Sequence, residues 1–277
     1  MNAVPRLETL TRLGFAARGV LYLTIAWLAI EAHRTTGSAG ALRSMAGGGM
    51  SRVALAVIAL GLLAYGAWRC AEGLLDLEGA GDGAKGALVR LVHGTSGVLH
   101  LVLGLLAGAL ALGMSGAGAG GGGGADSATG WVLGLPGGGL ILRLAALGFM
   151  AGGLAQGWSA YRLKFLKQLD PPAAGRPWIK WIGRLGYLAR GVVFVLIGWL
   201  LWRAASASDP QQAGGVGEAL ASLSGWMRVA VAGGLGLFGV FSIVQAAYRR
   251  ITDPHVLSRL AARSPAHRSA ARGRAGH

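Results

Sequence analysis

The chain has 277 residues, of which 53% are hydrophobic, 13% are charged and 50 are glycines. This composition is too apolar and too poor in charge for an ordinary soluble domain. The net charge of +15 belongs to basic residues that flank long apolar runs, which is typical of a membrane protein and argues against a nucleic-acid-binding one.

Six apolar runs follow one another along the chain, each uninterrupted, free of proline and close to the roughly 20 residues that cross the hydrocarbon. They lack the two-residue alternation of barrel strands, so we predict an all-α integral membrane protein. The first run is expected to remain as a span and not to be removed as a signal peptide, because residues 185–204 nearly repeat it in mid-chain. The predicted spans are 13–32, 53–75, 89–112, 139–161, 183–203 and 227–248.

The spans form a repeated unit of two helices. Residues 12–29 and 184–201 are nearly the same string, and residues 90–107 are a weaker third copy. Because each unit has two spans, every copy enters the membrane in the same direction, which predicts a pseudo-threefold arrangement about the membrane normal. The expected divisions are a cytoplasmic N-terminus (1–11), repeat 1 (12–78), repeat 2 (88–165), a cytoplasmic linker (166–182), repeat 3 (183–250) and a basic disordered tail (251–277).

Lysine and arginine are concentrated on one side of the predicted spans. Most of the 26 basic residues lie before the first span, between spans two and three, between spans four and five, and after the sixth. The positive-inside rule therefore predicts that both termini are cytoplasmic. The arginine-rich tail after residue 251 is expected either to bind anionic lipid, at about 1 kcal/mol per charge near the surface, or simply to hold the terminus inside.

The motif R-L-G-x-x-A-R-G-V occurs at residues 12–20 and again at 184–192. With three tandem helix pairs, it resembles the bacterial membrane family "domain of unknown function 1206", in which a two-span unit occurs three times. The second unit departs from the motif, with Val92 in place of the first glycine and Ser96 in place of the arginine. The resemblance implies six spans and a location in the bacterial inner membrane, and it implies no activity.

Small residues recur in the first helix of each unit at a spacing of seven, which places each pair on one face of a helix. Such a face lets helix backbones approach closely inside lipid, so helix packing is the expected role. The alternative is a narrow path lined by glycine. The predicted packing residues are Gly19, Ala26, Gly97, Gly104, Gly191 and Gly198.

Four polar side chains are predicted to lie within the spans. Arg18 and Arg190 occupy equivalent positions, about 9 Å deeper than the arginines that open their helices. Each either snorkels toward the interface or contributes to an anion or headgroup site on the cytoplasmic side. His93 and His100 occur in the second unit alone, and either serve a function or bond neighbouring backbone carbonyls.

The positions equivalent to His100 are Tyr22 and Phe194. If the first helices of the three units line a common axis, these three rings are expected to form one layer that plugs the centre. Tyr22 is then expected to hydrogen bond to His100.

Motifs of enzymes, nucleotide sites and metal sites are absent from the sequence. The single cysteine, Cys70, excludes an internal disulfide and a CxxC motif. We expect no catalytic residue, cofactor or metal, no nucleic-acid partner, and the lipid bilayer as the surroundings. The expected function is a non-enzymatic structural or interaction role in the envelope. The alternatives are a pore or carrier for a small solute along the threefold axis and, third, a haem- or metal-dependent redox protein that uses the two histidines.

The predicted topology can be tested by the accessibility of single cysteines in a background without Cys70. Cysteines placed beside Lys85, Lys167 and Arg263 should react only from the cytoplasm, and those beside Ser38, Asp126 and Asp209 only from outside, because lysine and arginine are retained inside. Reversal of either set would refute both the orientation and the number of spans.

Overall fold

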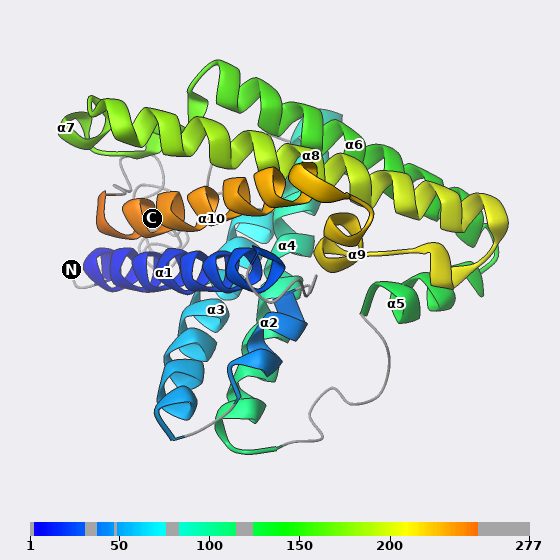
Figure 1. Ribbon diagram of the computed structural model, residues 1–277, viewed down its shortest axis with the longest axis horizontal. Helices are drawn as coiled ribbons and strands as arrows, with labels where there is room; N and C mark the ends of the chain where they lie inside the picture. Colours follow the sequence, from blue (N-terminus) through cyan, green and yellow to red (C-terminus); the bar gives the residue numbers. More distant parts are fainter. Residues whose placement is uncertain (1–2, 31–37, 47–48, 76–82, 115–123, 249–277) are drawn as a thin grey trace, which may run out of the picture.

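A computed structural model describes residues 3–30, 38–46, 49–75, 83–114 and 124–248. This part of the chain is helical throughout and has no strand (Figure 1). Six helices in it are long and apolar enough to cross a membrane: α1 (Ala3–Ile30), α3 (Gly49–Leu75), α4 (Ala84–Ala111), α6 (Gly138–Tyr161), α8 (Pro177–Ala207) and α10 (Gly225–Tyr248). Six shorter pieces connect them: α2 (Ser38–Ser44), α5 (Gly124–Leu133), η1 (Lys164–Gln168), α7 (Pro171–Ala174), η2 (Pro210–Gln212) and α9 (Val216–Ala221).

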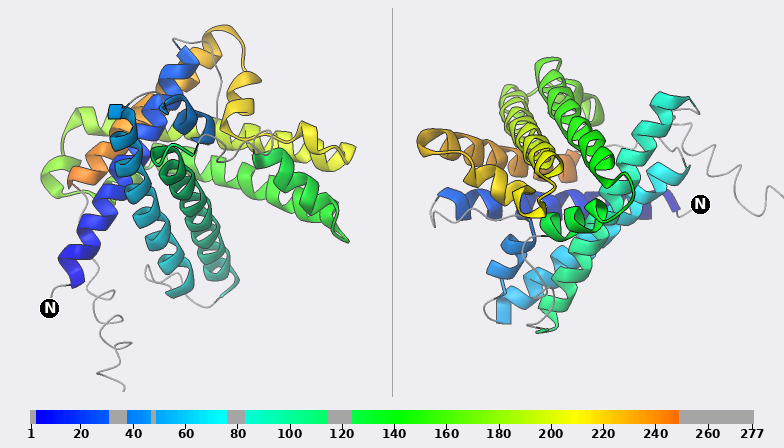
Figure 2. Two further views of the ribbon diagram at one scale, coloured as in Figure 1. Left: turned by 90° about the horizontal axis from the view of Figure 1, so that it is seen from below. Right: turned by 90° about the vertical axis from the view of Figure 1, so that its right-hand side faces the viewer.

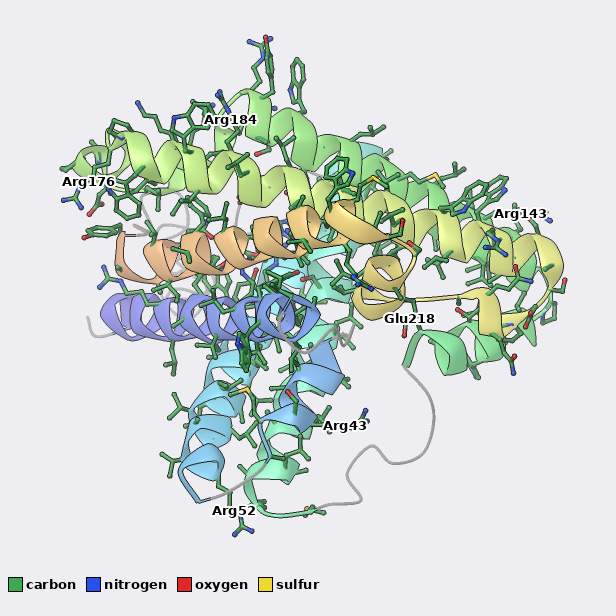
Figure 3. The ribbon with its side chains drawn as sticks, viewed as in Figure 1. Arg43, Arg52, Arg143, Arg176, Arg184 and Glu218 are labelled. Atoms are coloured by element: carbon green, nitrogen blue, oxygen red, sulfur yellow. The ribbon has the colours of Figure 1, made fainter. Side chains whose placement is uncertain are left out.

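The six long helices make the protein an all-α integral membrane protein. Each contains one predicted span, except that residues 31 and 32 lie outside the described part and α4 ends one residue before the predicted end at 112. The predicted tail and residues 115–123 also lie outside the described part. The longest, α8, begins at Pro177, inside the expected linker, because proline is well suited to the first turn of a helix. Arg143 near the start of α6 and Arg176 before α8 lie at opposite ends of this helix pair (Figure 3).

The most extensive helix contacts join neighbouring units. The second helix of unit one (α3) packs on the first helix of unit two (α4), α6 of unit two packs on α8 of unit three, and α10 of unit three packs on α1 of unit one. The pairing is therefore cyclic, and the three pairs spread from a common centre (Figure 2). Whether an axis along the membrane normal relates the three pairs stays a prediction.

A pair of glycines lies at the crossing of each of these helix pairs. A Cβ on Gly19 would lie 2.8 Å from the carbonyl oxygen of Gly239, and one on Gly97 would lie 2.8 Å from that of Gly66. In the third pair, a Cβ on Gly191 would lie 2.8 Å from the Gly153 oxygen. No side chain fits at these distances, so glycine is what allows the backbones to touch.

Two turns further along each first helix lies the second predicted packing position. A Cβ on Gly104 would lie 2.8 Å from Leu63 of α3, and one on Gly198 would lie 2.7 Å from Met150 of α6. In the first unit, Ala26 faces Gly236 of α10, whose Cβ would lie 3.3 Å away. The three contacts occupy the same register in the three units: Gly104–Leu63, Gly198–Met150 and Ala26–Gly236.

Contacts within a unit occur in the first and third units but are lost in the second. A Cβ on Gly61 of α3 would lie 2.6 Å from the Ala17 methyl group of α1, and Gly234 of α10 lies equally close against Ala189 of α8. The equivalent glycine of unit two, Gly148, has nothing within 4 Å of its Cβ position. Accordingly, α4 and α6 form no packed pair of the kind seen for α1–α3 and α8–α10.

The short helices between spans complete the core. In α2, Ala41 and Leu42 are fully buried, and in α9, Ala219 and Leu220 are fully buried as well. Both pairs belong to one apolar cluster with the long helices. Each of these two short helices, α2 and α9, thus anchors its loop by an Ala-Leu pair.

The glycine crossings predict a sharp dependence of stability on side-chain bulk. Gly191→Leu should destabilise the protein by more than about 2 kcal/mol, because overpacking must separate two backbones. Thermal unfolding in detergent measures the effect. The matched control is Gly233→Leu on α10, where the Cβ position is open, and its melting temperature should change little. Equal melting temperatures for the two variants would refute a packing role for Gly191.

Candidate functional site

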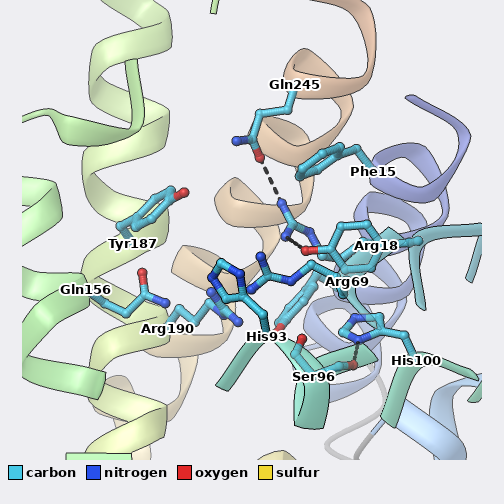
Figure 4. Close-up of a pocket in the computed structure, with 12 residues that line it drawn as sticks. Phe15, Arg18, Arg69, His93, Ser96, His100, Gln156, Tyr187, Arg190 and Gln245 are labelled. Carbon is cyan, nitrogen blue, oxygen red and sulfur yellow. Dashed lines mark hydrogen bonds between the residues drawn. The ribbon is translucent and has the colours of Figure 1, made fainter. Parts of the chain in front are cut away.

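A cavity of about 250 Å³ lies between the long helices, and all six contribute side chains to its wall. The wall is mainly polar, and the cavity is partly open to the outside. Figure 4 shows that side chains from α1, α3 and α10 meet those from α4, α6 and α8 across it. The predicted intramembrane residues Arg18, Arg190, His93 and His100 all line this one cavity.

Arg18 is the most extensively bonded of these residues and is only 7% exposed. Its guanidinium donates to the Tyr65 hydroxyl over 3.0 Å, to the Gln245 side-chain oxygen over 2.8 Å and to the Ser242 hydroxyl over 3.3 Å. The same group lies 4.5 Å from the centre of the Phe15 ring. Arg18 therefore ties α1 to α3 and to α10 (Figure 4).

All of the hydrogen-bond acceptors of Arg18 within the described residues are neutral. Burying a charge is costly unless it is paired, and hydrogen bonds and aromatic faces offset that cost only in part. The head of the Arg18 side chain is held by residues from two other helices. Arg18 thus contributes a buried positive charge without a carboxylate beside it in this part of the chain.

Arg190 is the equivalent residue of the third unit and enters the cavity from α8. Its guanidinium lies 4.6 Å from the centre of the Phe194 ring and 5.0 Å from that of Phe238. The Arg18 guanidinium lies 5.0 Å from the same Phe238 ring. Within the described residues, the buried Nε of Arg190 has no hydrogen-bond acceptor. The two arginines therefore share one aromatic platform, and both line the cavity.

A third guanidinium, that of Arg69 on α3, also lines the cavity. Its Nη1 donates over 2.7 Å to Glu72, whose side chain is buried, and the same Glu72 oxygen lies 3.6 Å from Nδ1 of His93. Both residues lie near the end of α3, inside the predicted span 53–75, where α4 covers them. Their spacing of three residues was the available signal, because it places opposite charges on one helix face.

His100 bonds within its own helix. Its Nδ1 lies 2.7 Å from the carbonyl oxygen of Ser96, and its ring packs edge-on against Tyr65 with centroids 4.7 Å apart. The expected layer of Tyr22, His100 and Phe194 is not formed as a plug. Tyr22 packs edge-on against Phe238 and Phe194 against Phe149, at 5.0 and 5.7 Å, and Tyr22 and His100 border the cavity.

The predicted packing residues lie apart from this wall, at the helix crossings described above. Cys70 also serves a crossing, since its backbone nitrogen lies 2.6 Å from the Cβ position of Gly97. Within the described residues, no group of three histidine, cysteine, aspartate or glutamate side chains is placed to hold a metal ion. The chemistry that this arrangement offers is hydrogen-bond donation and positive charge.

Together, the six spans, the threefold repeat and the cationic cavity define a class of polytopic helical membrane protein with a polar centre. The family model described as Domain of Unknown Function (DUF1206) matches residues 13–76, 91–162 and 185–249. The chain belongs to this family, and the three matched segments are its three repeats.

A curated relative with this similarity is a protein of Bacillus subtilis (strain 168) named "Uncharacterized protein YxxB". It is 27% identical over 260 residues, which cover 90% of this chain and 93% of the relative. The similarity therefore extends over nearly the whole length of both proteins. No solved structure matches the chain.

The contacts of His100 predict a small effect of its replacement. His100→Phe keeps a ring against Tyr65 and loses one hydrogen bond inside α4, so the protein should insert and lose about 1 kcal/mol or less, as is usual for polar contacts in membranes. Thermal unfolding in detergent, compared with the wild type, measures this loss. A loss of several kcal/mol would show that His100 belongs to a buried network that the contacts of its ring do not account for.

Proposed function

We propose that this protein is a non-enzymatic, multi-pass protein of the bacterial inner membrane that binds an anionic group in the cavity between its helices. Both termini are cytoplasmic in this proposal, as the distribution of lysine and arginine requires. The cavity then lies toward the cytoplasmic half of the membrane, since Arg18 and Arg190 are only six residues beyond the arginines that open the two R-L-G motifs.

The observation that carries the proposal is the charge of the wall. Three guanidiniums border the cavity, and the one described carboxylate in contact with any of them, Glu72, is already bonded to Arg69. Uncompensated charge in a membrane interior is expensive and marks functional sites. An anion offsets the excess charge, and guanidinium groups bind oxyanions through several parallel donors.

A purely structural role in the envelope accounts for the glycine crossings but does not account for Arg190. Packing alone is served by an apolar residue at that position, whereas Arg190 places a charged guanidinium on the wall of a polar cavity. Passage of a small solute through the protein would require the cavity to open to both sides of the membrane. Binding is the step that such a carrier and a static ligand site have in common, and it is therefore the function proposed.

Anion binding predicts a saturable rise in melting temperature in neutral detergent. Phosphate should stabilise the wild type when it replaces chloride at constant ionic strength. A ligand that binds only the folded state raises the melting temperature. Arg190→Gln should weaken the apparent phosphate affinity by about tenfold or more, since charge-assisted hydrogen bonds are lost.

Arg143→Gln is the matched control, because Arg143 is exposed on α6 and remote from the cavity wall. This variant should respond to phosphate as the wild type does. Equal phosphate responses of the wild type and Arg190→Gln would overturn binding in the cavity.

A further inference from the structure

The wall of the cavity differs in the second unit from its counterparts in the first and third. In those two units, the first and second helices pack together, closing the space between them. In each of these two units, a glycine of the first helix lies against an aromatic residue of the second. Gly14 contacts Tyr65, and a Cβ on Gly186 would lie 2.7 Å from the backbone of Phe238.

Two substitutions remove this contact in the second unit. The position of Gly14 and Gly186 is occupied by Val92, and the position of Tyr65 and Phe238 is occupied by Gly152. A bulkier residue on α4 and a missing ring on α6 prevent the same close fit. The two helices diverge from the centre of the molecule (Figure 2), and Gly148, which marks the packed face in the other units, meets only open space.

The cavity lies directly inside this opening. His93, Ser96 and His100 of α4 border the cavity, and Gln156 borders it from α6. The remaining helix neighbours around the ring, from α4 through α3, α1, α10 and α8 to α6, are packed on one another. The separation of α4 and α6 is therefore the natural entrance to the cavity from the side.

The outer rim of this entrance is apolar. On α4, Val92 and Leu99 are 55% and 56% exposed, and on α6, Leu147 and Leu154 are 50% and 71% exposed. In an integral membrane protein, such side chains on spanning helices face acyl chains. The entrance thus joins an apolar outer surface in the hydrocarbon to a cationic wall inside.

We propose that the ligand of the cavity is the phosphate group of an anionic phospholipid, which enters sideways between α4 and α6 while its acyl chains stay on the apolar faces of these two helices. This inference rests on the proposed anion-binding function and names the source of the anion. The phosphodiester oxygens accept hydrogen bonds from Arg190 and from the neighbouring guanidiniums. Since Glu72 is engaged with Arg69 and His93, the wall offers no free carboxylate among the described residues for a choline group, and a headgroup with net negative charge is preferred.

A free oxyanion from the cytoplasm shares the same chemistry, but the rim argues for a lipid. A site for a soluble anion is served by a polar entrance, whereas the entrance between α4 and α6 is flanked by leucine and valine. An anionic phospholipid matches both the cationic wall and the apolar rim, because its phosphate group is attached to acyl chains that can lie against the rim.

The test uses the full-length protein in phosphatidylcholine nanodiscs that contain a minor fraction of phosphatidylglycerol. The protein is then extracted in mild detergent, and the bound lipids are counted by mass spectrometry. The wild type should retain phosphatidylglycerol at least about fivefold over its share of the bilayer, and Arg190→Gln should abolish the enrichment, because the charge-assisted bonds to phosphate are lost. Arg143→Gln should retain it.

A second variant tests the entrance. Val92→Gly with Gly152→Phe restores the residue types of the packed units and should slow the uptake of phosphatidylglycerol by about tenfold, because the backbones can then approach. Binding of inorganic phosphate in detergent should be unchanged. The matched control, Val57→Gly with Gly233→Phe, makes the same substitutions on α3 and α10, away from the entrance, and should take up lipid at the wild-type rate. If the double variant fails to fold, Gly148→Leu places bulk in the same opening and takes its place.

The outcomes separate the two proposals. Enrichment that depends on Arg190 and is slowed by closing the entrance supports the lipid site. Arg190-dependent binding of inorganic phosphate without lipid enrichment overturns the lipid site and leaves anion binding intact. Lipid enrichment that closing the entrance does not slow overturns the sideways route, and absence of both kinds of binding overturns both proposals.

Discussion

The close approach of backbones at three glycine crossings is the constraint on which the structure depends. Lipid tails are as apolar as leucine side chains, so burial alone does not drive spans together, and contact must come from packing. Gly19, Gly97 and Gly191 each face a glycine of the preceding second helix in the ring. Because these contacts join different units, they convert three similar segments of chain into one assembly.

The glycine crossings bring the polar side chains that line the cavity to the centre of the molecule. Once the helices are brought together, Arg18 and Arg190 converge on one aromatic ring, that of Phe238. The two arginines are not equivalent in their surroundings, since Arg18 is bonded to α3 and α10 and Arg190 retains an unsatisfied donor. One arginine therefore joins three helices by hydrogen bonds, whereas the other borders the cavity against aromatic rings. The same position of the repeat has different surroundings in the first and third units.

Much of this fold could be predicted because its determinants are local. Hydropathy gives the six helices, and repetition of R-L-G-x-x-A-R-G-V gives the units, without knowledge of any tertiary contact. The same register identified Gly19, Gly97 and Gly191 as positions of close approach. Their partners could not be identified, because a sequence of tandem helix pairs suggests packing within each unit, whereas the most extensive contacts lie between units.

The ion pair of Arg69 and Glu72 could not be predicted from the sequence for a related reason. A charge near the end of a hydrophobic run is normally a signal for topology, so Arg69 and Glu72 gave no indication of burial. Their burial depends on α4 lying across the end of α3, which is a tertiary contact. His100, in contrast, could be identified from the sequence, because it lies deep in a span, where an ionisable residue is unusual in itself.

Two bonds of Arg18 span almost the whole chain, with a sequence separation of 224 from Ser242 and 227 from Gln245. During synthesis the first helix is therefore complete long before its partners on α10 exist, whereas Tyr65 of α3 follows at a separation of only 47. At about 5–20 residues per second, the delay is on the order of 10–45 s. Throughout that time the arginine must be accommodated by water or lipid headgroups at the membrane surface. The full set of hydrogen bonds that holds Arg18 in place therefore forms only when the last span is present.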